Sequence, residues 1–318
     1  MENSIFELPE IALELQKKDN EHASSRMGLI GFPSGGDKIR RFLKQYNTAL
    51  FQDKLIDMGD LLAALLPDTT NVITDLVEEG SYLPIVLMHS TISKTIDSNL
   101  IEHFHSPKFI CSRLSESLYN YHCIGLQGHL MSNDWIWDTD KHLRLGQIHE
   151  SIDTAEVLLR NADYVDINLN VLRLGDLPGS SSPSSAGLSI EELCQIAKFV
   201  GASTKLKAIT ISGYNENSDI HGIAARNVAM LIWYIMDGFL LRQRELEQVN
   251  SEKTYTIIPD AIAGELTFIE HQRTGRWWVE VYIESAGKPV RLACSKEDYE
   301  AACQNDISDR ITSLLSRV

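Results

Sequence analysis

Cysteine is scarce in this chain, and the few cysteines are scattered. The 318 residues contain five of them: Cys111, Cys123, Cys194, Cys294 and Cys303. They form an odd set without a C-x-x-C pair, which favours a reducing compartment and argues against a zinc site. We therefore predict five free thiols that pack in the core.

Positive charge is also in short supply. The chain has 29 Lys and Arg against 44 Asp and Glu, which gives a formal net charge of −15. A field of this sign repels phosphate backbones, and no stripe of Lys and Arg with interleaved aromatic residues offsets it. Nucleic acid is therefore not an expected partner.

Long hydrophobic runs are missing as well. Glu2, Glu7, Glu10 and Glu14 occupy the start of the chain, where a secretory signal would have a basic segment followed by an apolar one. The most apolar stretch, 228–241, contains an aspartate and is shorter than the ~20 residues that cross a bilayer. We expect a cytoplasmic protein without a membrane segment, in which this stretch is a buried helix.

What the chain does have is a regular alternation. From Met27 onward, a short apolar run, a turn with Gly or Asp and an amphipathic stretch follow one another repeatedly. This order is typical of βαβ units that build a parallel sheet. It predicts strands at 27–31, 54–58, 83–88, 108–111, 122–126, 143–146, 164–170 and 206–212. It predicts helices at 38–46, 70–79, 151–161, 190–200 and 222–248.

Two boundaries are marked more clearly than the others. Ser189, followed three residues later by Glu192, forms a capping box at the start of the helix at 190–200. The segment 177–187 is rich in Ser, Pro and Gly, but a strand and a helix flank it closely. We interpret it as a loop within the domain rather than a linker between domains.

After residue 248 the pattern changes to short strands and one helix, predicted at 255–258, 265–271, 277–283 and 296–303. The sequence therefore predicts a three-layer α/β/α domain with a mostly parallel central sheet over residues 1–248. A small C-terminal α+β appendage of antiparallel strands and a helix would follow over residues 249–318. We expect Trp277, Trp278 or Tyr299 to pack the appendage onto the main domain, because large aromatic side chains on short strands need a partner surface.

Several strand ends resemble the arginase (ureohydrolase) family. Segment 166–179 with 186–192 is similar to the family's Ser-x-Asp-x-Asp-Ala-x-x-Pro-x-x-Ala-Pro-Gly, which leads into Gly-Gly-Leu-(Ser/Thr)-x-x-Glu. Segment 211–219 resembles Glu-x-Asn-Pro-x-x-Asp, and segment 27–33 with Ile39 and Arg40 resembles the first strand and helix. The stretches closest to a bacterial branch related to formimidoylglutamase are 120–127, 143–148 and 160–163. The resemblance implies the arginase fold.

The resemblance also implies a site. In active relatives, two Mn²⁺ ions activate a bridging hydroxide that attacks a guanidino or formimino carbon. Their ligands come from three strand ends, which we expect to converge on one cleft of the parallel sheet. The family's Gly-Gly-Asp-His-Ser falls on a segment that contains His89. Its Asp-x-His-x-Asp falls on Cys111, Arg113 and Ser115, or alternatively on Gln127 and His129, and its Asp-x-Asp falls on Asn168 and Asn170.

No aspartate or glutamate stands at any of these aligned positions. Two dications need several carboxylates, whereas an amide offers no charge and Arg113 would add a cation. The family's substrate-contacting acid corresponds to Gly213, so the metal and substrate contacts are absent together. Asp166 and Asp176 are the nearest carboxylates in sequence, and we expect them to cap turns or face solvent.

We therefore expect no cofactor, and a ureohydrolase-fold protein that has lost dimanganese hydrolase activity and keeps a binding or regulatory role. Its partner would be a second copy or an active relative, and its small-molecule ligand is unknown. The alternative is a metal-dependent C–N hydrolase that acts on an amidino or formimino substrate with an atypical site. Convergence of His89, His129, Asp166 and Asp176 would favour this alternative.

Other chemistries fit the sequence less well. The glycines at 31–36 follow a strand but lack the Gly-Lys-(Ser/Thr) of a phosphate-binding loop, and they are expected to be turn residues. No Gly-x-Ser-x-Gly elbow of a serine hydrolase occurs. His129, His142 and His149, with His89, do not pair on one helical face beside a carboxylate, so a separate histidine metal site is not expected.

Overall fold

The computed structural model divides the chain into two units, Met1–Leu240 and Leu241–Val318. We describe each unit by itself. The residues that the structure describes are 26–32, 35–51, 53–61, 69–80, 82–89, 104, 106–112, 122–130, 142–178, 180, 184–246, 251–260, 265–283, 288–308 and 311–312.

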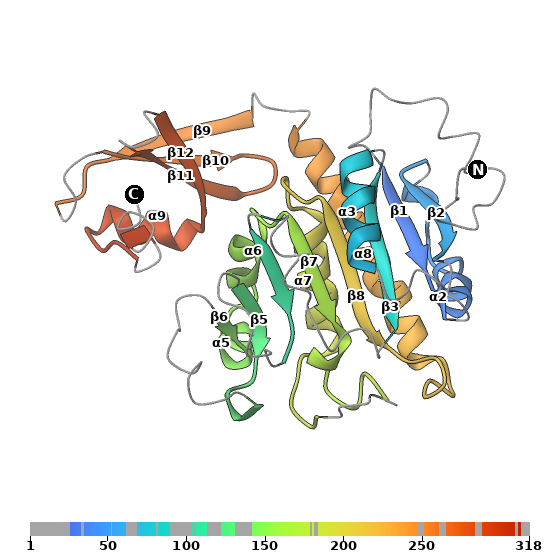
Figure 1. Ribbon diagram of the computed structural model, residues 1–318. Helices are drawn as coiled ribbons and strands as arrows, with labels where there is room; N and C mark the ends of the chain where they lie inside the picture. Colours follow the sequence, from blue (N-terminus) through green and yellow to red (C-terminus); the bar gives the residue numbers. More distant parts are fainter. Residues whose placement is uncertain are drawn as a thin grey trace. The chain divides into compact units, whose positions relative to one another are not determined.

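The first unit is built on one parallel sheet of eight strands (Figure 1). Their order across the sheet is β2-β1-β3-β8-β7-β4-β5-β6, and each described pair of neighbours is parallel. The strands are β1 (Met27–Gly31), β2 (Leu55–Asp60), β3 (Leu83–His89), β4 (Pro107–Ile110), β5 (His122–Leu126), β6 (His142–Arg144), β7 (Tyr164–Asn168) and β8 (Ala208–Tyr214). The predicted α/β class with a parallel sheet is confirmed.

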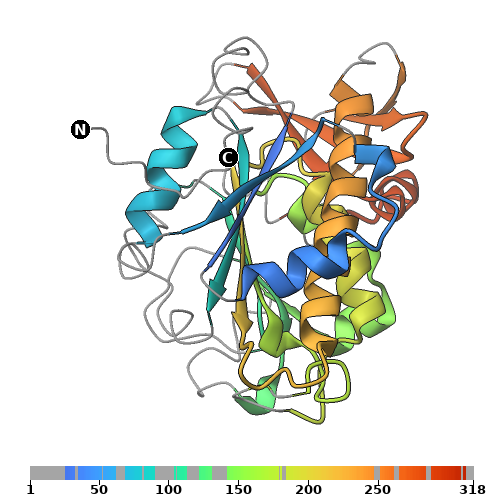
Figure 2. The same ribbon diagram turned by 90° about the vertical axis from the view of Figure 1, so that its right-hand side faces the viewer.

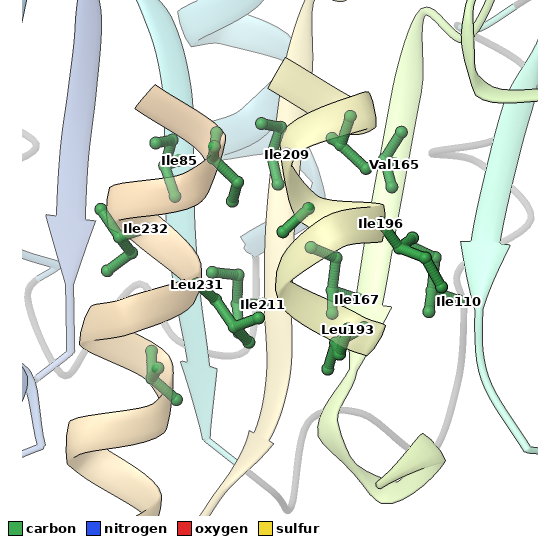
Figure 3. Close-up of a cluster of buried hydrophobic side chains, with 14 of the residues drawn as sticks. Ile85, Ile110, Val165, Ile167, Leu193, Ile196, Ile209, Ile211, Leu231 and Ile232 are labelled. Carbon is green, nitrogen blue, oxygen red and sulfur yellow. The ribbon is translucent and has the colours of Figure 1, made fainter. Parts of the chain in front are cut away.

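Helices cover both faces of this sheet, because its strands are apolar on both sides and both sides must be buried (Figure 2). Helix α3 (Thr69–Glu79) covers one face. The helices on the other face are α2 (Gly36–Leu43), α5 (Leu145–Glu150), α6 (Asp153–Leu159), α7 (Ile190–Gly201) and α8 (Ile223–Leu246). Val165 and Ile167, alternate residues of β7, face the helix layer that contains Ile196 and Leu193 of α7, as Figure 3 shows. The result is the predicted three-layer arrangement.

The predicted buried helix at 228–241 lies within α8. In the described part of the chain, its residues Ile223–Arg244 form the one helix long and apolar enough to span a bilayer, but 61% of its apolar window is buried inside the structure. Ala225, Val228 and Ile232 are fully buried against the sheet and α7. Burial of this extent is what a core helix requires.

Two predicted strands end earlier in the structure than the sequence indicates, because a polar side chain terminates each of them. The strand predicted at 143–146 stops at Arg144, because α5 begins at Leu145 and Gln147 Oε1 accepts a hydrogen bond from Arg144 N at 2.8 Å. The strand predicted at 164–170 stops at Asn168, whose side chain caps a 3₁₀ turn, Leu169–Val171. Both turns depend on side-chain hydrogen bonds that apolar periodicity does not detect.

The second unit is a four-stranded antiparallel sheet with one helix. The strands, in the order β12-β11-β10-β9, are β9 (Glu252–Ile257), β10 (Leu266–His271), β11 (Arg276–Ile283) and β12 (Lys288–Cys294), and helix α9 spans Lys296–Cys303. The sequence analysis missed β12, where Pro289 and two basic residues hide the alternation. Proline is tolerated there because β12 is an edge strand.

An aromatic cluster holds this second unit together. Trp277 is buried and stacks on Tyr255 and on Tyr299 of α9, with ring centroids 5.3 and 4.7 Å apart. Phe268 meets Tyr299 edge to face. Trp277 and Tyr299 thus pack inside their own unit, while Trp278 lies on the opposite face of β11. Packing of this unit on the main domain stays a prediction.

Candidate functional site

The strand ends that carry the family-like segments lie at one edge of the sheet. Strands β3, β8, β7 and β4 are consecutive neighbours and run parallel, so their carboxyl ends share an edge (Figure 1). His89 is opposite Tyr214 in the strand register, and Asn168 is opposite Ser212. Ligands in open parallel sheets bind at this edge. We call it the carboxyl edge.

Asn168 and Asn170 both have amide oxygens that are already engaged. Asn168 Oδ1 accepts a hydrogen bond from Asn170 N at 3.0 Å, which caps the 3₁₀ turn after β7. Asn170 Oδ1 accepts a hydrogen bond from Ser180 Oγ at 2.7 Å. The two amides therefore order the loop between β7 and α7, at the positions that the sequence analysis aligned with the family's metal-binding aspartates.

Gly213 needs to be glycine for its backbone. Its φ is +90°, in the region that L side chains rarely adopt, and a Cβ atom there would lie 3.3 Å from Asn168 Oδ1. An acidic side chain at this position would strain the end of β8. The backbone therefore favours glycine at the position that the sequence analysis aligned with the family's substrate-contacting acid.

Asp166 is buried, and the expectation that it caps a turn or faces solvent is wrong. It lies on the same face of β7 as Tyr164, in the layer covered by α3. Its carboxylate accepts hydrogen bonds from Thr210 Oγ1 at 2.5 Å and from Ser212 Oγ at 3.4 Å. Burial raises the pKa of Asp166 to about 6, and the two hydroxyl donors offset part of this effect.

Asp166 makes stability depend on pH. Its folded pKa is raised above the unfolded value, so its stabilising contribution is complete below about pH 4 and is lost as pH rises through about 6. We expect Asp166→Asn, which keeps a hydrogen-bonding group of the same size, to gain stability relative to the natural protein over this range. The gain would approach about 3 kcal/mol at most.

The measurement is urea denaturation of both proteins at steps from pH 4 to pH 7.5. The difference between the two unfolding free energies cancels the other titrating groups. A difference that stays constant across this range would show that Asp166 does not titrate as described.

Asp176 stands apart from this buried carboxyl. Its Oδ2 pairs with Arg173 Nε at 2.5 Å, and its carbonyl oxygen accepts a hydrogen bond from Asn227 of α8 at 2.6 Å. Asp176 therefore fixes a turn of the loop after β7. The expectation that it caps a turn fits this position.

The alternative ligand positions after β5 are one buried residue, Gln127, and one exposed residue, His129. Gln127 is buried, and its amide binds the loop before α7 through Ala186 O at 3.2 Å and Ser184 Oγ at 3.4 Å. His129 is exposed in the 3₁₀ turn Gly128–Leu130. Gln127 thus has the same loop-fixing role as Asn170.

Cys111 is the remaining described position of the aligned ligand set. It is buried directly after β4, with its Sγ 3.8 Å from Cys123 Sγ. Arg113 and Ser115 lie outside the described residues, as does the side chain of His89. Among the described residues, no group of three His, Cys, Asp or Glu could hold a metal ion.

The sequence analysis did not identify the hydroxyl residues that donate hydrogen bonds to Asp166. Thr210 and Ser212 lie on one face of the otherwise apolar strand β8, and Tyr164 OH lies 2.8 Å from Thr210 Oγ1. Alternating hydroxyls within an apolar run were the available signal. Their acceptor, Asp166, is 44 or 46 residues away in sequence, so the pairing could not be read from the chain.

The glycines at 31–36 make room for an ion pair. A Cβ on Gly31 or Gly36 would lie 2.1 or 2.5 Å from Asp60 Oδ1. Arg40 Nη1 contacts the same carboxylate at 2.7 Å, and Arg40 Nε binds Asp57 at 2.9 Å. These glycines are therefore required by the packing of Arg40, in addition to the expected turn.

Comparison with curated proteins relates part of the chain to one enzyme class. Formimidoylglutamase of Ralstonia nicotianae is 28% identical over 131 residues, which are 38% of this chain and 40% of that protein. Formimidoylglutamase of Salmonella newport is 32% identical over 98 residues, 31% of this chain and 30% of that protein. The chain thus matches about two fifths or less of the length of these relatives. No family model matches it.

Comparison with solved structures extends over most of the fold. Formiminoglutamase of Trypanosoma cruzi with Mn²⁺ matches with a TM-score of 0.58 at 18% identity, covering 72% of this chain and 98% of that one. Agmatine ureohydrolase of Thermoplasma volcanium matches with a TM-score of 0.56 at 12% identity, over 74% and 99% of the two chains. Arginase of Bacillus subtilis matches with a TM-score of 0.53 at 14% identity, over 66% and 98%.

These structures correct one expectation. The sequence analysis expected no cofactor, but structures that share this fold hold Mn²⁺, so manganese belongs among the cofactors of the fold. The reason is the shared fold, which matches over 72% of this chain although the two sequences are only 18% identical. The described side chains by themselves do not fit a two-metal centre, because Asn168 and Asn170 are uncharged and their oxygens accept internal hydrogen bonds.

Proposed function

This chain belongs to the arginase (ureohydrolase) superfamily, and we propose that it binds a small molecule at the carboxyl edge without hydrolysing it. One observation carries the proposal. Asn168 and Asn170 occupy the aligned positions of a metal-binding Asp-x-Asp segment, and both amides serve as structural hydrogen-bond acceptors. A binding or regulatory role follows from a retained scaffold with altered chemistry.

The chemical argument concerns the nucleophile. Attack on a planar amidino or formimino carbon needs a hydroxide, and bulk water has a pKa near 15.7. In the family, two Mn²⁺ ions supply that hydroxide at neutral pH. Here Asn168 and Asn170 contribute no negative charge, Gly213 contributes no acid, and the buried Asp166 carboxylate of β7 accepts hydrogen bonds from Thr210 and Ser212. Asn168, Asn170 and Gly213 therefore offer no base that could take a proton from water.

The rival proposal is a hydrolase with an atypical site. It is favoured by the Mn²⁺ in solved structures of similar fold. It requires that His89 and His129 act together with carboxylates beyond Asp166 and Asp176, whose partners are described above. The two proposals differ in one observable, which is turnover in the presence of Mn²⁺.

The test compares the natural protein with an Asn168→Asp/Asn170→Asp variant. We expect no release of urea from arginine or agmatine, and no release of formamide from N-formimidoylglutamate, by the natural protein supplied with Mn²⁺. The variant should bind Mn²⁺ about ten-fold more tightly or better, because two carboxylates are hard, charged ligands.

Calorimetry measures the affinity, and coupled assays measure the products. The control is Gln243→Glu near the end of α8, which adds a negative charge outside the segments that resemble the family. Turnover by the natural protein that a chelator abolishes would establish the rival proposal.

We also propose that the protein works as a homo-oligomer or as the partner of an active relative, because a binding subunit acts by changing the state of another protein. Sedimentation of the protein alone and mixed with a formimidoylglutamase distinguishes the two. A protein that sediments as a monomer in both samples would contradict this proposal.

A further inference from the structure

Helix α8 presents one row of side chains away from the sheet. The row, which we call the outward stripe of α8, consists of Ile223, Arg226, Met230, Trp233, Asp237 and Leu240. We propose that a second copy of this chain binds to the outward stripe, with the two α8 helices antiparallel. This inference rests on the homo-oligomer of the proposed function and names the surface that forms it.

Burial separates the outward stripe from the rest of the helix. Within 223–240, the members of the stripe and Tyr234 are exposed or half-buried, and every other residue is buried. The members follow one another at alternate spacings of three and four residues, which keeps a row of side chains on one side of a helix. Leu231 and Ile232, on the opposite side, belong to the buried core above the strands (Figure 3).

The outward stripe is largely apolar although it lies on the surface. Four of its six members are large apolar side chains; Ile223 is 40% exposed and the other three are half-buried. Phe51 meets Trp233 edge to face with ring centroids 5.4 Å apart, and its neighbour Leu50 is 57% exposed. Tryptophan, methionine and arginine in one surface row are typical of protein–protein interfaces.

The order of residue types along the stripe indicates what binds there. From Ile223 to Leu240 it reads apolar, positive, apolar, apolar, negative, apolar. A two-fold axis that crosses the helix midway between Met230 and Trp233 makes every contact occur twice, once in each direction. The facing residues of the two copies are then Ile223 with Leu240, Arg226 with Asp237, and Met230 with Trp233.

Charge selects the antiparallel arrangement. A parallel pair would place Arg226 against Arg226 and Asp237 against Asp237, and like charges that face each other oppose association. Within one chain, Asp237 Oδ2 lies 2.8 Å from Lys198 Nζ, and the Arg226 guanidinium lies 4.9 Å from the centre of the Phe42 ring. The Asp237 side chain stays 31% exposed and Arg226 is exposed, so both can also face a second copy.

The experiment is sedimentation equilibrium of the full-length protein over a range of concentrations. We expect a dimer, and we expect Arg226→Glu or Asp237→Lys alone to raise its dissociation constant about ten-fold or more, because each creates two like-charge pairs across the two-fold axis. The double variant exchanges the two charges and should associate nearly as well as the natural protein. Lys198 repels the new lysine in the single and double variants alike, so this rescue cannot arise within one chain.

The control is Glu150→Lys, which reverses an exposed charge of α5 beside the edge strand β6 and should leave association unchanged. Circular dichroism of each variant verifies that it folds. A dimer that Arg226→Glu and Asp237→Lys leave intact would overturn the inference, and so would a folded double variant that associates no better than the single ones.

The inference and the proposed function fail in different ways. A natural protein that is monomeric alone but sediments with a formimidoylglutamase would overturn the inference and leave the partner role of the proposed function. A monomer in every sample would overturn the inference and both oligomeric roles. Turnover in the presence of Mn²⁺ by a protein whose double variant still recovers association would overturn the proposed function alone.

Discussion

Gly238→Ala is expected to destabilise the first unit by about 3 kcal/mol or more, which exceeds the usual cost of an overpacked core side chain. Gly238 lies in α8, and a Cβ atom there would be 2.0 Å from the carbonyl oxygen of Lys198 in α7. The contact is reciprocal, because a Cβ on Gly201 of α7 would be 1.9 Å from Ile235 O of α8. The obstructing atoms are backbone, so the helices themselves must separate.

Separation of α7 and α8 would open the main core. The two helices lie side by side over β3, β8 and β7, where Leu193, Ile196, Leu231 and Ile232 fill the space above the strands (Figure 3). Urea denaturation of the variant measures the loss. The control is Gly146→Ala in α5, where a Cβ meets no atom within 4 Å and should be neutral or stabilise by up to about 1 kcal/mol. Equal stabilities of the two variants would contradict the helix contact.

Asp219→Ala is expected to cost about 2–4 kcal/mol, the sum of a lost helix cap and buried hydrogen bonds. Asp219 is buried before α8, and its carboxylate accepts hydrogen bonds from Ala224 N at 3.1 Å and Ala225 N at 3.0 Å. Tyr214 OH donates to it at 3.3 Å, and Lys38 Nζ lies 3.6 Å away. One carboxylate thus joins the starts of α2 and α8 to the end of β8.

Thermal and urea unfolding check this prediction together with two companions. Asp219→Asn keeps one oxygen and should lose about half as much. Asn217→Ala changes an exposed side chain two residues earlier and should stay within about 0.5 kcal/mol. If all three variants unfolded alike, Asp219 would not be the cap of α8.

Much of the fold could be predicted because its strands are short apolar runs. β1 and β5 begin and end where the sequence places them, and α7 begins after Ser189, whose hydroxyl accepts a hydrogen bond from Glu192 N. α9 also matches its predicted range, and Ser295 with Asp298 forms a second capping box. Local signals of this kind do not depend on partners that are distant in sequence.

For the candidate site, the sequence predicts which residue types are present but not how their side chains pair. The absence of carboxylates at Asn168 and Asn170 is visible in the sequence, but the hydrogen bond from Ser180 that fixes Asn170 is not. Asp166 was expected to cap a turn or face solvent, but it is buried and accepts hydrogen bonds from Thr210 and Ser212. Its donors lie on the neighbouring strand β8, which folding brings into register. Side-chain pairing across a parallel sheet needs the strand order, which the sequence implies only through the resemblance.

The proposed loss of hydrolysis is tested most directly by following the reacting carbon itself. N-formimidoylglutamate labelled with ¹³C at the formimino carbon is incubated with an equal concentration of the natural protein and Mn²⁺, and its ¹³C resonance is recorded over several hours. The account predicts that the resonance decays at the rate of the enzyme-free solution. Formation of one or more equivalents of labelled formamide per protein chain, above that background, would contradict it.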